Sequence, residues 1–317
     1  AALVGVALAI LLARRLAAHG SAGSPPHRAM RRIAAAATIA AAVIAWPIAV
    51  RLAGDGALRI FAIDVGQGDA LAVRTPAGRW IVIDAGPRTD RFDAGRARVV
   101  PFLLQHGARR IDLLVLTHPH ADHIGGAQAL FEAFDVAAVV DPAVPAAYDL
   151  YLGTLAAARA EESRWLAARE GRVLRVDDVV LEFLAPDSAS LDARDDPNDY
   201  SVVFRLSFGR FRALFLGDAP EAVEEAIVAE HRTAVASQVI KVGHHGSRTS
   251  TGEALLEAAA PGIALVSVGE RNRYGHPDPG VMARLARRGV RILRTDQRGT
   301  VTLRATAEAE IELLTSR

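Results

Sequence analysis

The sequence predicts an α/β protein in which two β-sheets pack face to face with helices outside them, preceded by helical segments that span a membrane. Three observations lead to this prediction: strand-like runs begin at residue 58, helix-like runs alternate with them, and uncharged apolar runs precede residue 51. A sandwich with outer helices buries the apolar faces of both kinds of element. The 317 residues, 51% of them hydrophobic, are enough for one large domain after the membrane segments.

Two apolar runs near the start of the chain predict membrane helices. Residues 33–50 are uncharged and long enough to cross a bilayer, which takes about 20 residues with a lower limit of about 17. Residues 1–13 are apolar but too short, so we expect them to be part of an earlier helix. A signal peptide is the alternative for the second run, but its apolar region is usually shorter and nearer the N-terminus. Residues 1–51 are therefore expected to end a polytopic membrane domain.

The loop between these runs predicts the topology. Residues 14–32 carry five arginines and no acidic residue, and short basic loops stay in the cytoplasm. One crossing later, the rest of the chain would lie on the extracytoplasmic face. Residues 1–51 hold six of the 37 basic residues and none of the 36 acidic ones, which leaves that remainder with an excess of five acidic residues. Nucleic-acid binding by this part would need local basic patches.

Residues 58–317 read as one domain, and its first half begins with a strand meander. The strand-like runs lie between glycine-containing turns: LRIFAIDV (58–65), DALAVRT (69–75) and RWIVIDAG (79–86). A helix is expected at 95–106, followed by the strand IDLLVLTH and a helix from His123. A strand VAAVVDP and a long helix over 147–169 complete this half.

The second half repeats the alternation of strands and helices. Strands are expected at 178–186, 201–208, 211–217, 237–242, 262–268, 290–294 and 299–304. Helices are expected at 220–231, 251–259 and 278–288. The chain has no cysteine, which excludes disulfides and thiolate metal sites. Lys241 is its only lysine, which we attribute to the arginine- and alanine-rich composition of a GC-rich genome.

Four side chains of metal-ligand type are crowded after one apolar strand. In HPHADH, His118, His120 and His123 lie with Asp122 at the end of LLVL. A strand end, a tight loop and a helix start can turn these side chains toward one point. Imidazole and carboxylate suit Zn²⁺, Mn²⁺ or Fe²⁺, and three or fewer protein ligands leave a position for water. The alternative is a surface or hydrogen-bonded histidine cluster, which the density of ligands disfavours.

The segment THPHADHIGG resembles the HxHxDH signature of the metallo-β-lactamase fold hydrolases. The resemblance implies an αββα sandwich with a dinuclear metal site at one edge. Further segments are similar, in the same order, to the C-terminal domain of the ComEC competence proteins: FAIDVGQGDALAV, WIVIDAG, NDYSVVFRL, FRALFLGDA, IKVGHHGSRTS, SVGERNRYGHP and ILRTDQRGTV. In that family a membrane channel takes up one DNA strand, and this module is proposed to degrade the other strand outside the bacterial cell.

The resemblance also implies a ligand set for one or two ions of Mn²⁺ or Zn²⁺. His118 and His120 would hold one metal, and Asp122 and His123 the other. Asp218 matches the aspartate that bridges both ions. Either His244 or His245 matches the last histidine, and the sequence leaves that choice open; the other is expected to support a ligand from outside the coordination shell.

One departure from the wider fold concerns a further histidine. Many members supply it between HxHxDH and the bridging aspartate, whereas this chain has no histidine between His123 and His231. The segment DDPNDYSVV lies there instead, and Asn198, Asp199 or Ser201 could stand in weakly. Since ComEC proteins share this pattern, one metal position is expected to be under-filled and to favour Mn²⁺ or Mg²⁺.

Other polar residues are expected around the metals. Asp69 in GQGDA and Asp84 in IDAG would lie beside the site. Substrate phosphates would meet four residues in late loops: Ser247, Arg248, Asn272 and Arg273. We expect Asp122 to orient the nucleophile and His276 to protonate the leaving oxygen.

These features predict a metal-dependent phosphodiesterase or nuclease acting on one strand of incoming DNA during transformation. Its expected partners are DNA, the membrane and other DNA-uptake proteins, and its expected location is the bacterial cytoplasmic membrane. Two alternatives remain open: a hydrolase of another cell-surface phosphodiester or of a lactam-type amide, and a non-catalytic DNA-guiding module with a depleted metal site. Metal content separates the last alternative from the first two.

Overall fold

The computed structural model describes residues 55–144, 148–188, 191 and 196–315, together with four isolated positions between residues 35 and 42. The chain divides into two units, residues 1–56 and 57–317, and only the second is described in detail. The helices expected at 1–13 and 33–50 lie outside the described residues, apart from those four positions. In the described part of the chain, no helix is both long and apolar enough to cross a membrane.

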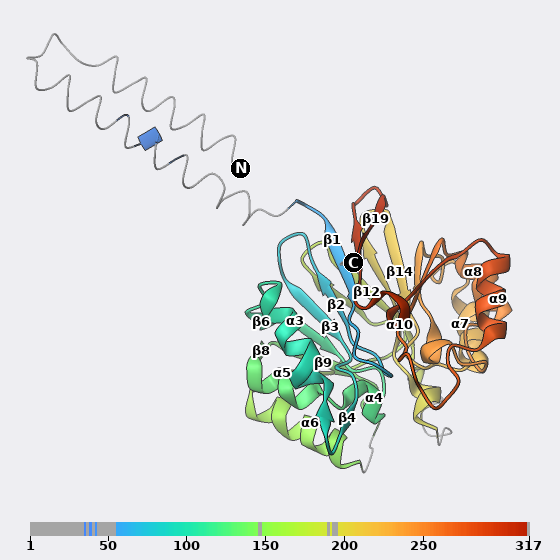
Figure 1. Cartoon of the computed structure of the whole chain (residues 1–317), viewed down its shortest axis with the longest axis horizontal. Coiled ribbons are helices and arrows are strands. Elements are labelled where there is room, and N and C mark those ends of the chain that lie inside the picture. The colour runs from blue at the N-terminus through green and yellow to red at the C-terminus, as the bar shows by residue number, and fades with distance from the viewer. Residues whose placement is uncertain are drawn as a thin grey trace, which may run out of the picture. The chain divides into compact units, whose positions relative to one another are not determined.

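Two mixed β-sheets form the centre of the second unit (Figure 1). The first sheet contains, in spatial order, β10 (Arg164–Ala167), β9 (Ala138–Asp141), β7 (Leu113–Val115), β3 (Trp80–Ile83), β2 (Leu71–Arg74), β1 (Leu58–Ala62), β18 (Val301–Ala305) and β19 (Ile311–Thr315). The second contains β11 (Val173–Val176), β12 (Val179–Ala185), β13 (Val203–Phe208), β14 (Phe211–Phe215), β15 (Val239–Lys241), β16 (Ile263–Val266) and β17 (Arg291–Arg294).

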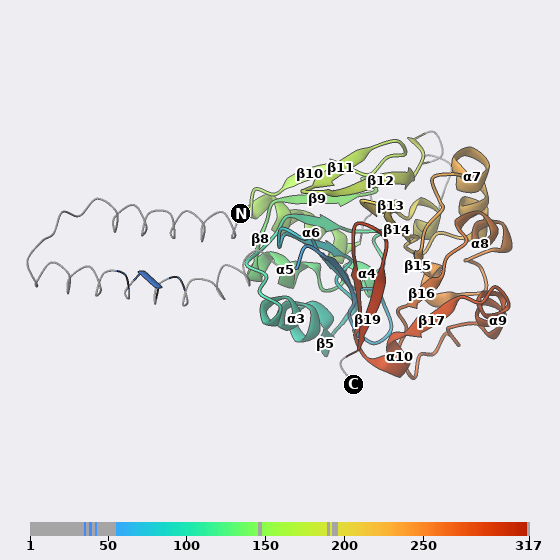
Figure 2. The ribbon, with the colours of Figure 1, turned by 90° about the horizontal axis from the view of Figure 1, so that it is seen from above.

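Helices cover the outer face of each sheet (Figure 2). On the first sheet lie α3 (Val100–Gln105), α5 (Ala127–Ala133) and α6 (Asp149–Ala160). On the second lie α7 (Glu221–His231), α8 (Glu253–Ala259) and α9 (Pro279–Arg287). The short elements are β4 (Arg88–Thr89), β5 (Phe92–Asp93), η1 (Gly95–Val99), β6 (Arg110–Ile111), α4 (Ala121–Ile124), β8 (Asp135–Val136), η3 (Pro197–Tyr200), η4 (Gly243–Gly246) and α10 (Thr295–Arg298).

The side-chain alternation of the strands builds three apolar layers. In β1, Leu58 and Ile60 enter the core between the two sheets, whereas Phe61 enters the core under the helices of the first sheet. In β14, Phe215 enters the core between the sheets and Leu214 packs under the helices of the second. Successive strand residues point to opposite faces, so each strand supplies two layers. The predicted sandwich with outer helices is therefore confirmed for this unit.

The long helix expected over 147–169 is wrong in its second part. Helix α6 ends at Ala160, and Arg164–Ala167 form strand β10, which pairs in parallel with β9 at the edge of the first sheet. Trp165 packs against the core under the helices of that sheet. The alanine-rich segment has good helix propensity, but pairing with a distant strand overrides it.

The parallel strands bring several loops to one edge of the sandwich. Strand β3 runs parallel to β7, and β14 runs parallel to β15 and β16. The loops at the carboxyl ends of these strands contain Asp84, the HPHADH segment, Asp218, the two adjacent histidines of η4 and the loop 269–278. Such carboxyl-end edges are where α/β folds place ligands.

Candidate metal centre

The HPHADH segment leaves β7 and turns directly into α4. His120 is the residue before that helix, Asp122 lies in its first turn, and His123 is fully buried at its base. His118 is also buried, and its Nε2 lies 3.0 Å from His120 Nδ1. The backbone passes closely here: a Cβ atom at Gly126 would collide with the carbonyl oxygen of Ala85. The glycines after the motif therefore serve close backbone packing, as the sequence predicts.

His123 is held between two carboxylates. Its Nδ1 lies 2.8 Å from Asp84 Oδ2, and its Nε2 lies 3.2 Å from Asp218 Oδ2. Asp84 in turn accepts hydrogen bonds from the backbone N–H and the hydroxyl of Thr117, at 2.8 and 2.7 Å. Burial alone would lower the pKa of His123, but Asp218 and Asp84 outweigh it and hold that pKa well above its usual value. Burial raises the pKa of Asp84.

Of the two adjacent histidines, His245 is the buried one. Its Nε2 lies 3.4 Å from Asp122 Oδ2 and 3.7 Å from Asp218 Oδ2. Burial would lower its pKa, but Asp218 and Asp69 raise the pKa to about 9. The side chain of His244 is 28% exposed, with Nε2 3.7 Å from Asp218 Oδ2. The structure thus brings His245 into the buried cluster and leaves His244 at its margin.

Four buried residues meet the distance requirement of a metal site: Asp69, His123, Asp218 and His245 each offer an atom, and these atoms all lie within 4.8 Å of one another. Within the described residues, His123 Nε2, His245 Nε2 and Asp218 Oδ1 are buried without a hydrogen-bond partner. Unpaired buried polar atoms are rare in folded proteins. Two imidazole nitrogens facing a carboxylate oxygen therefore fit a divalent cation of the Zn²⁺, Mn²⁺ or Fe²⁺ type.

Asp218 is the meeting point of both halves of the domain. Its Oδ2 lies 3.8 Å from His118 Nε2, in addition to its approaches to His123 and His245. Burial would raise the pKa of Asp218, but His123 and His245 hold it well below the usual value. The same two histidines hold the pKa of Asp122 low against the effect of burial. Burial and the neighbouring His123 lower the pKa of His118.

Sequence reasoning missed the role of Lys241. Its buried ammonium lies 2.5 Å from Asp69 Oδ2 and donates a hydrogen bond to the carbonyl of Val242 at 2.9 Å. Burial would raise the pKa of Asp69, but Lys241 and His245 lower it to about 2. The available signal was a single lysine at a strand end, separated from GHHG by one valine. The arginine- and alanine-rich composition alone does not account for this contact.

The segment in place of the further histidine lies against Asp218. Ser201 is fully buried, and its hydroxyl accepts a hydrogen bond of 3.3 Å from the backbone N–H of Asp218. Asn198 Oδ1 is buried and has no hydrogen-bond partner among the described residues.

The loop after β16 forms one rim of the centre. The side-chain amide of Asn272 is used within the loop: it donates to the carbonyls of Gly269 and His276, and it accepts from the backbone N–H groups of Tyr274 and His276. Asn272 thus shapes the loop that carries His276. The His276 ring lies 5.7 Å from that of His244, and burial lowers its pKa.

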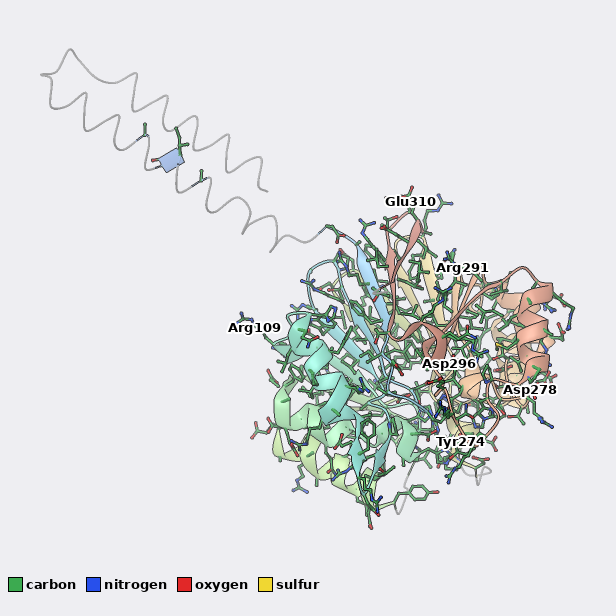
Figure 3. All side chains as sticks on the ribbon, in the orientation of Figure 1. Arg109, Tyr274, Asp278, Arg291, Asp296 and Glu310 are labelled. Atoms are coloured by element: carbon green, nitrogen blue, oxygen red, sulfur yellow. The ribbon has the colours of Figure 1, made fainter. Side chains whose placement is uncertain are left out.

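The remaining expected substrate residues differ in exposure. Arg248 is 82% exposed and pairs with Asp278 at 3.5 Å, whereas Arg273 donates to the Tyr274 hydroxyl at 3.0 Å. Ser247 is buried, with its hydroxyl 3.1 Å from that of Thr249. In Figure 3, Tyr274 and Asp278 lie at the lower right of the domain, away from Glu310 at the top.

An αββα sandwich with a buried histidine–aspartate cluster at this edge defines a protein of the metallo-β-lactamase fold class. The sequence model of the Metallo-beta-lactamase superfamily matches residues 63–270, and the chain belongs to this superfamily.

Curated relatives are competence and recombination proteins. The chain is 33% identical over 254 residues to ComE operon protein 3 of Bacillus subtilis, covering 76% of this chain and 32% of that protein. It is 35% identical over 239 residues to Competence protein ComA of Neisseria gonorrhoeae, covering 75% and 31%. The chain thus spans about a third of the length of these relatives. The family resemblance found in the sequence is confirmed.

Among solved structures, the diiron β-hydroxylase CmlA from Streptomyces venezuelae is similar with a TM-score of 0.53 at 14% identity. The match covers 78% of this chain and 54% of that one. At this identity the likeness supports the fold alone.

Proposed function

We propose that the chain is the metal-dependent phosphodiesterase module of a DNA-uptake protein and cleaves one strand of incoming DNA. One observation carries this proposal: three potential metal-ligand atoms at the sandwich edge are buried without a hydrogen-bond partner, namely His123 Nε2, His245 Nε2 and Asp218 Oδ1. The relatives named for competence support DNA as the substrate.

The residues fall into two ligand groups in this proposal. His118 and His120 hold one metal position, Asp122, His123 and His245 hold the other, and Asp218 lies between them. A bound divalent metal supplies a water of lowered pKa and neutralises charge on phosphoryl oxygens. Histidine and aspartate accept Zn²⁺ and Mn²⁺ alike, and we favour Mn²⁺ at the weaker position.

The other residues bind and orient the substrate. Asp122 is one-third exposed and can orient the attacking water by accepting a hydrogen bond from it. His276 lies across His244 from the buried cluster, where it can donate a proton to the leaving oxygen. Arg248 and Arg273 lie at the exposed rim, where guanidinium groups can pair with phosphate oxygens.

The setting of the module is part of the same proposal. Residues 1–51 end a membrane domain in the bacterial cytoplasmic membrane, residues 58–317 form the hydrolase domain outside it, and other DNA-uptake proteins are its partners. A reporter fused after Arg317 in the complete protein tests the topology. Activity of a reporter that functions only in the cytoplasm would contradict it.

Digestion of labelled single- and double-stranded DNA tests the activity. The chain, stripped with a chelator, receives Mn²⁺, Zn²⁺ or Mg²⁺ separately, with the Asp218→Asn variant as control. We expect cleavage that rises with added Mn²⁺ and is lost in the variant. Metal binding without DNA cleavage would point to another phosphodiester, and absence of metal binding would point to a non-catalytic module.

A further inference from the structure

The Asp69 carboxylate has the position of a metal ligand but is already engaged. It belongs to the four-residue group whose donor atoms lie within 4.8 Å of one another. Its Oδ2 is in contact with Lys241 Nζ at 2.5 Å, much closer than its approach of 4.0 Å to His123 Nδ1. A permanent cation of the protein therefore occupies the carboxylate that a divalent ion would otherwise attract.

The backbone holds this carboxylate where it is. The Asp69 N–H donates to the carbonyl of Asp122 at 3.1 Å, and the Gly86 N–H donates to the Asp69 carbonyl at 2.8 Å. Gly68 precedes it with φ +138°, and a Cβ atom there would collide with the same Asp122 carbonyl. The GQGD turn is thus packed closely against the HPHADH segment, which places the Asp69 side chain toward the cluster.

The remaining contacts of Asp69 are with the Nδ1 side of the His245 and His123 rings. Its Oδ1 is 3.3 Å from His245 Nδ1, whereas His245 Nε2 faces Asp122 and Asp218. His245 Nδ1 also lies 3.1 Å from the carbonyl oxygen of Ser267, so this carbonyl and the Asp69 carboxylate together orient the ring and leave Nε2 for a metal. The ammonium and the metal position are thus on opposite sides of the ring.

We propose that Lys241 holds Asp69 out of the metal coordination shell, so that Asp69 orients His245 rather than binding metal. Lys241 is then a positioning residue that sets the number of carboxylates available to the ions. This inference rests on the proposed metal site. It gives the only lysine of the chain a role that suits a compact buried ammonium better than the wide planar fork of arginine.

Calorimetric titration with Zn²⁺ alone tests the proposal on the chelator-stripped 317-residue chain. In Lys241→Met, the released Asp69 carboxylate adds a negative charge to the cluster, so Zn²⁺ should bind at least about tenfold more tightly than in wild type. The double variant Lys241→Met/Asp69→Asn has no carboxylate to release, and its affinity should return to within about threefold of wild type.

Thermal unfolding provides a second readout that does not depend on activity. Metal-free Lys241→Met should melt below wild type because a buried carboxylate has lost its counter-ion, and Zn²⁺ should raise its Tm more than it raises that of wild type. If Lys241→Met requires Zn²⁺ in order to fold, the same conclusion follows. Arg205→Met is a control for the loss of an ion pair away from the centre: it removes a partly exposed cation that pairs with Glu182 at 2.6 Å, and its response to Zn²⁺ should match that of wild type.

Two results would overturn the inference. One is a Zn²⁺ affinity in Lys241→Met that equals or falls below that of wild type, with a Zn²⁺-induced rise in Tm no larger than that of wild type, which means that the pair is only structural. The other is a double variant that binds as tightly as Lys241→Met. If wild type itself binds no metal, the proposed function fails instead.

Discussion

Two buried histidines at this centre are each backed by an aspartate, but the two aspartates are stabilised in different ways. Asp84 behind His123 accepts hydrogen bonds from the backbone and hydroxyl of Thr117, which are neutral donors. Asp69 behind His245 contacts the Lys241 ammonium. Accordingly, burial raises the pKa of Asp84, whereas Lys241 and His245 overcome burial and lower the pKa of Asp69 to about 2.

This difference indicates how the two halves of the domain contribute. For His123, the first half supplies Asp84, which accepts hydrogen bonds from the neutral donors of Thr117. The Asp84 carboxylate can share its charge with the metal through His123. The support for His245 is shared between the halves: the first supplies Asp69, and the second supplies the Lys241 ammonium that balances its charge, so this support adds little net charge. Each aspartate lies on the Nδ1 side of its ring, and the Ser267 carbonyl also accepts from His245 Nδ1. Orienting the ring from this side is the usual role of residues around metal-binding histidines.

Substituting Asp218, which histidines of both halves approach, should have the largest effect on DNA cleavage. Asp218→Asn keeps the size of the side chain but weakens its attraction for cations from both sides. We expect DNA cleavage to fall by more than the roughly 100-fold that residues outside the coordination shell cost. Initial rates with saturating Mn²⁺ measure this, with circular dichroism as the control for folding. Wild-type turnover in the variant would remove Asp218 from the centre.

The pH dependence of stability sharpens the comparison in metal-free protein. The pKa of His245 rises from 6.5 to about 9 on folding, so its contribution is complete below pH 6.5 and is lost as the pH rises through 9. That loss amounts to about 3 kcal/mol. The lowered pKa of Asp69 contributes to the free energy of unfolding above pH 3.8, and this contribution is lost as the pH falls toward 2.

Denaturant unfolding at a series of pH values measures this dependence. Saturating Zn²⁺ should abolish the decline between pH 6.5 and 9, because the metal takes the place of the proton on His245. A metal-free protein whose unfolding free energy stays level over that range would contradict the assignment.

Substituting the two supporting aspartates separately should destabilise the fold to different extents. Asp84→Asn keeps the shape but loses one charged acceptor for Thr117 and His123, at a cost of about 1–3 kcal/mol. Asp69→Asn leaves the Lys241 ammonium buried without a counter-ion, at a cost of about 3–5 kcal/mol. Urea unfolding at pH 7 compares them. Equal losses would mean that the ammonium makes no difference between the two supports.

The smallest expected effect concerns the segment that replaces the further histidine. Ser201 lies against the backbone of Asp218, so Ser201→His introduces an imidazole beside the bridging residue. We expect Mn²⁺ to bind a few-fold more tightly at the weaker position. Calorimetric titration measures the change, with Ser201→Ala as the control for lost packing. Unchanged affinity would place residue 201 outside ligand reach.

Sequence patterns predict what is local in this molecule. HPHADH is contiguous and follows an apolar strand, so it was found from its position, whereas Asp218 was assigned from the resemblance of FLGDA to the segment that carries the bridging aspartate. The segment Arg164–Ala167 was expected to be helical because its alanine-rich surroundings favour a helix. Its strand forms by pairing with β9, and the local sequence does not show that pairing. The sandwich itself follows from alternation along each strand, which needs no distant partner.

The parts of the site that escaped sequence reasoning depend on tertiary contacts. His244 and His245 are neighbours with left-handed backbone φ of 47° and 54°, so strand periodicity does not say which ring is buried. The contact of Lys241 with Asp69 joins the strand before GHHG to the turn after β1. No spacing rule relates those two segments.

Calorimetric titration of the chelator-stripped wild-type chain with Zn²⁺ at pH 7.5, repeated in buffers of different ionisation enthalpy, tests the central claim most directly. A metal that binds His245 must displace the proton that the acidic cluster holds on this imidazole in the metal-free protein. We predict saturable binding with release of about one or more protons per ion. Absence of binding heat, or binding without proton release, would contradict a metal centre built on these paired histidines and aspartates.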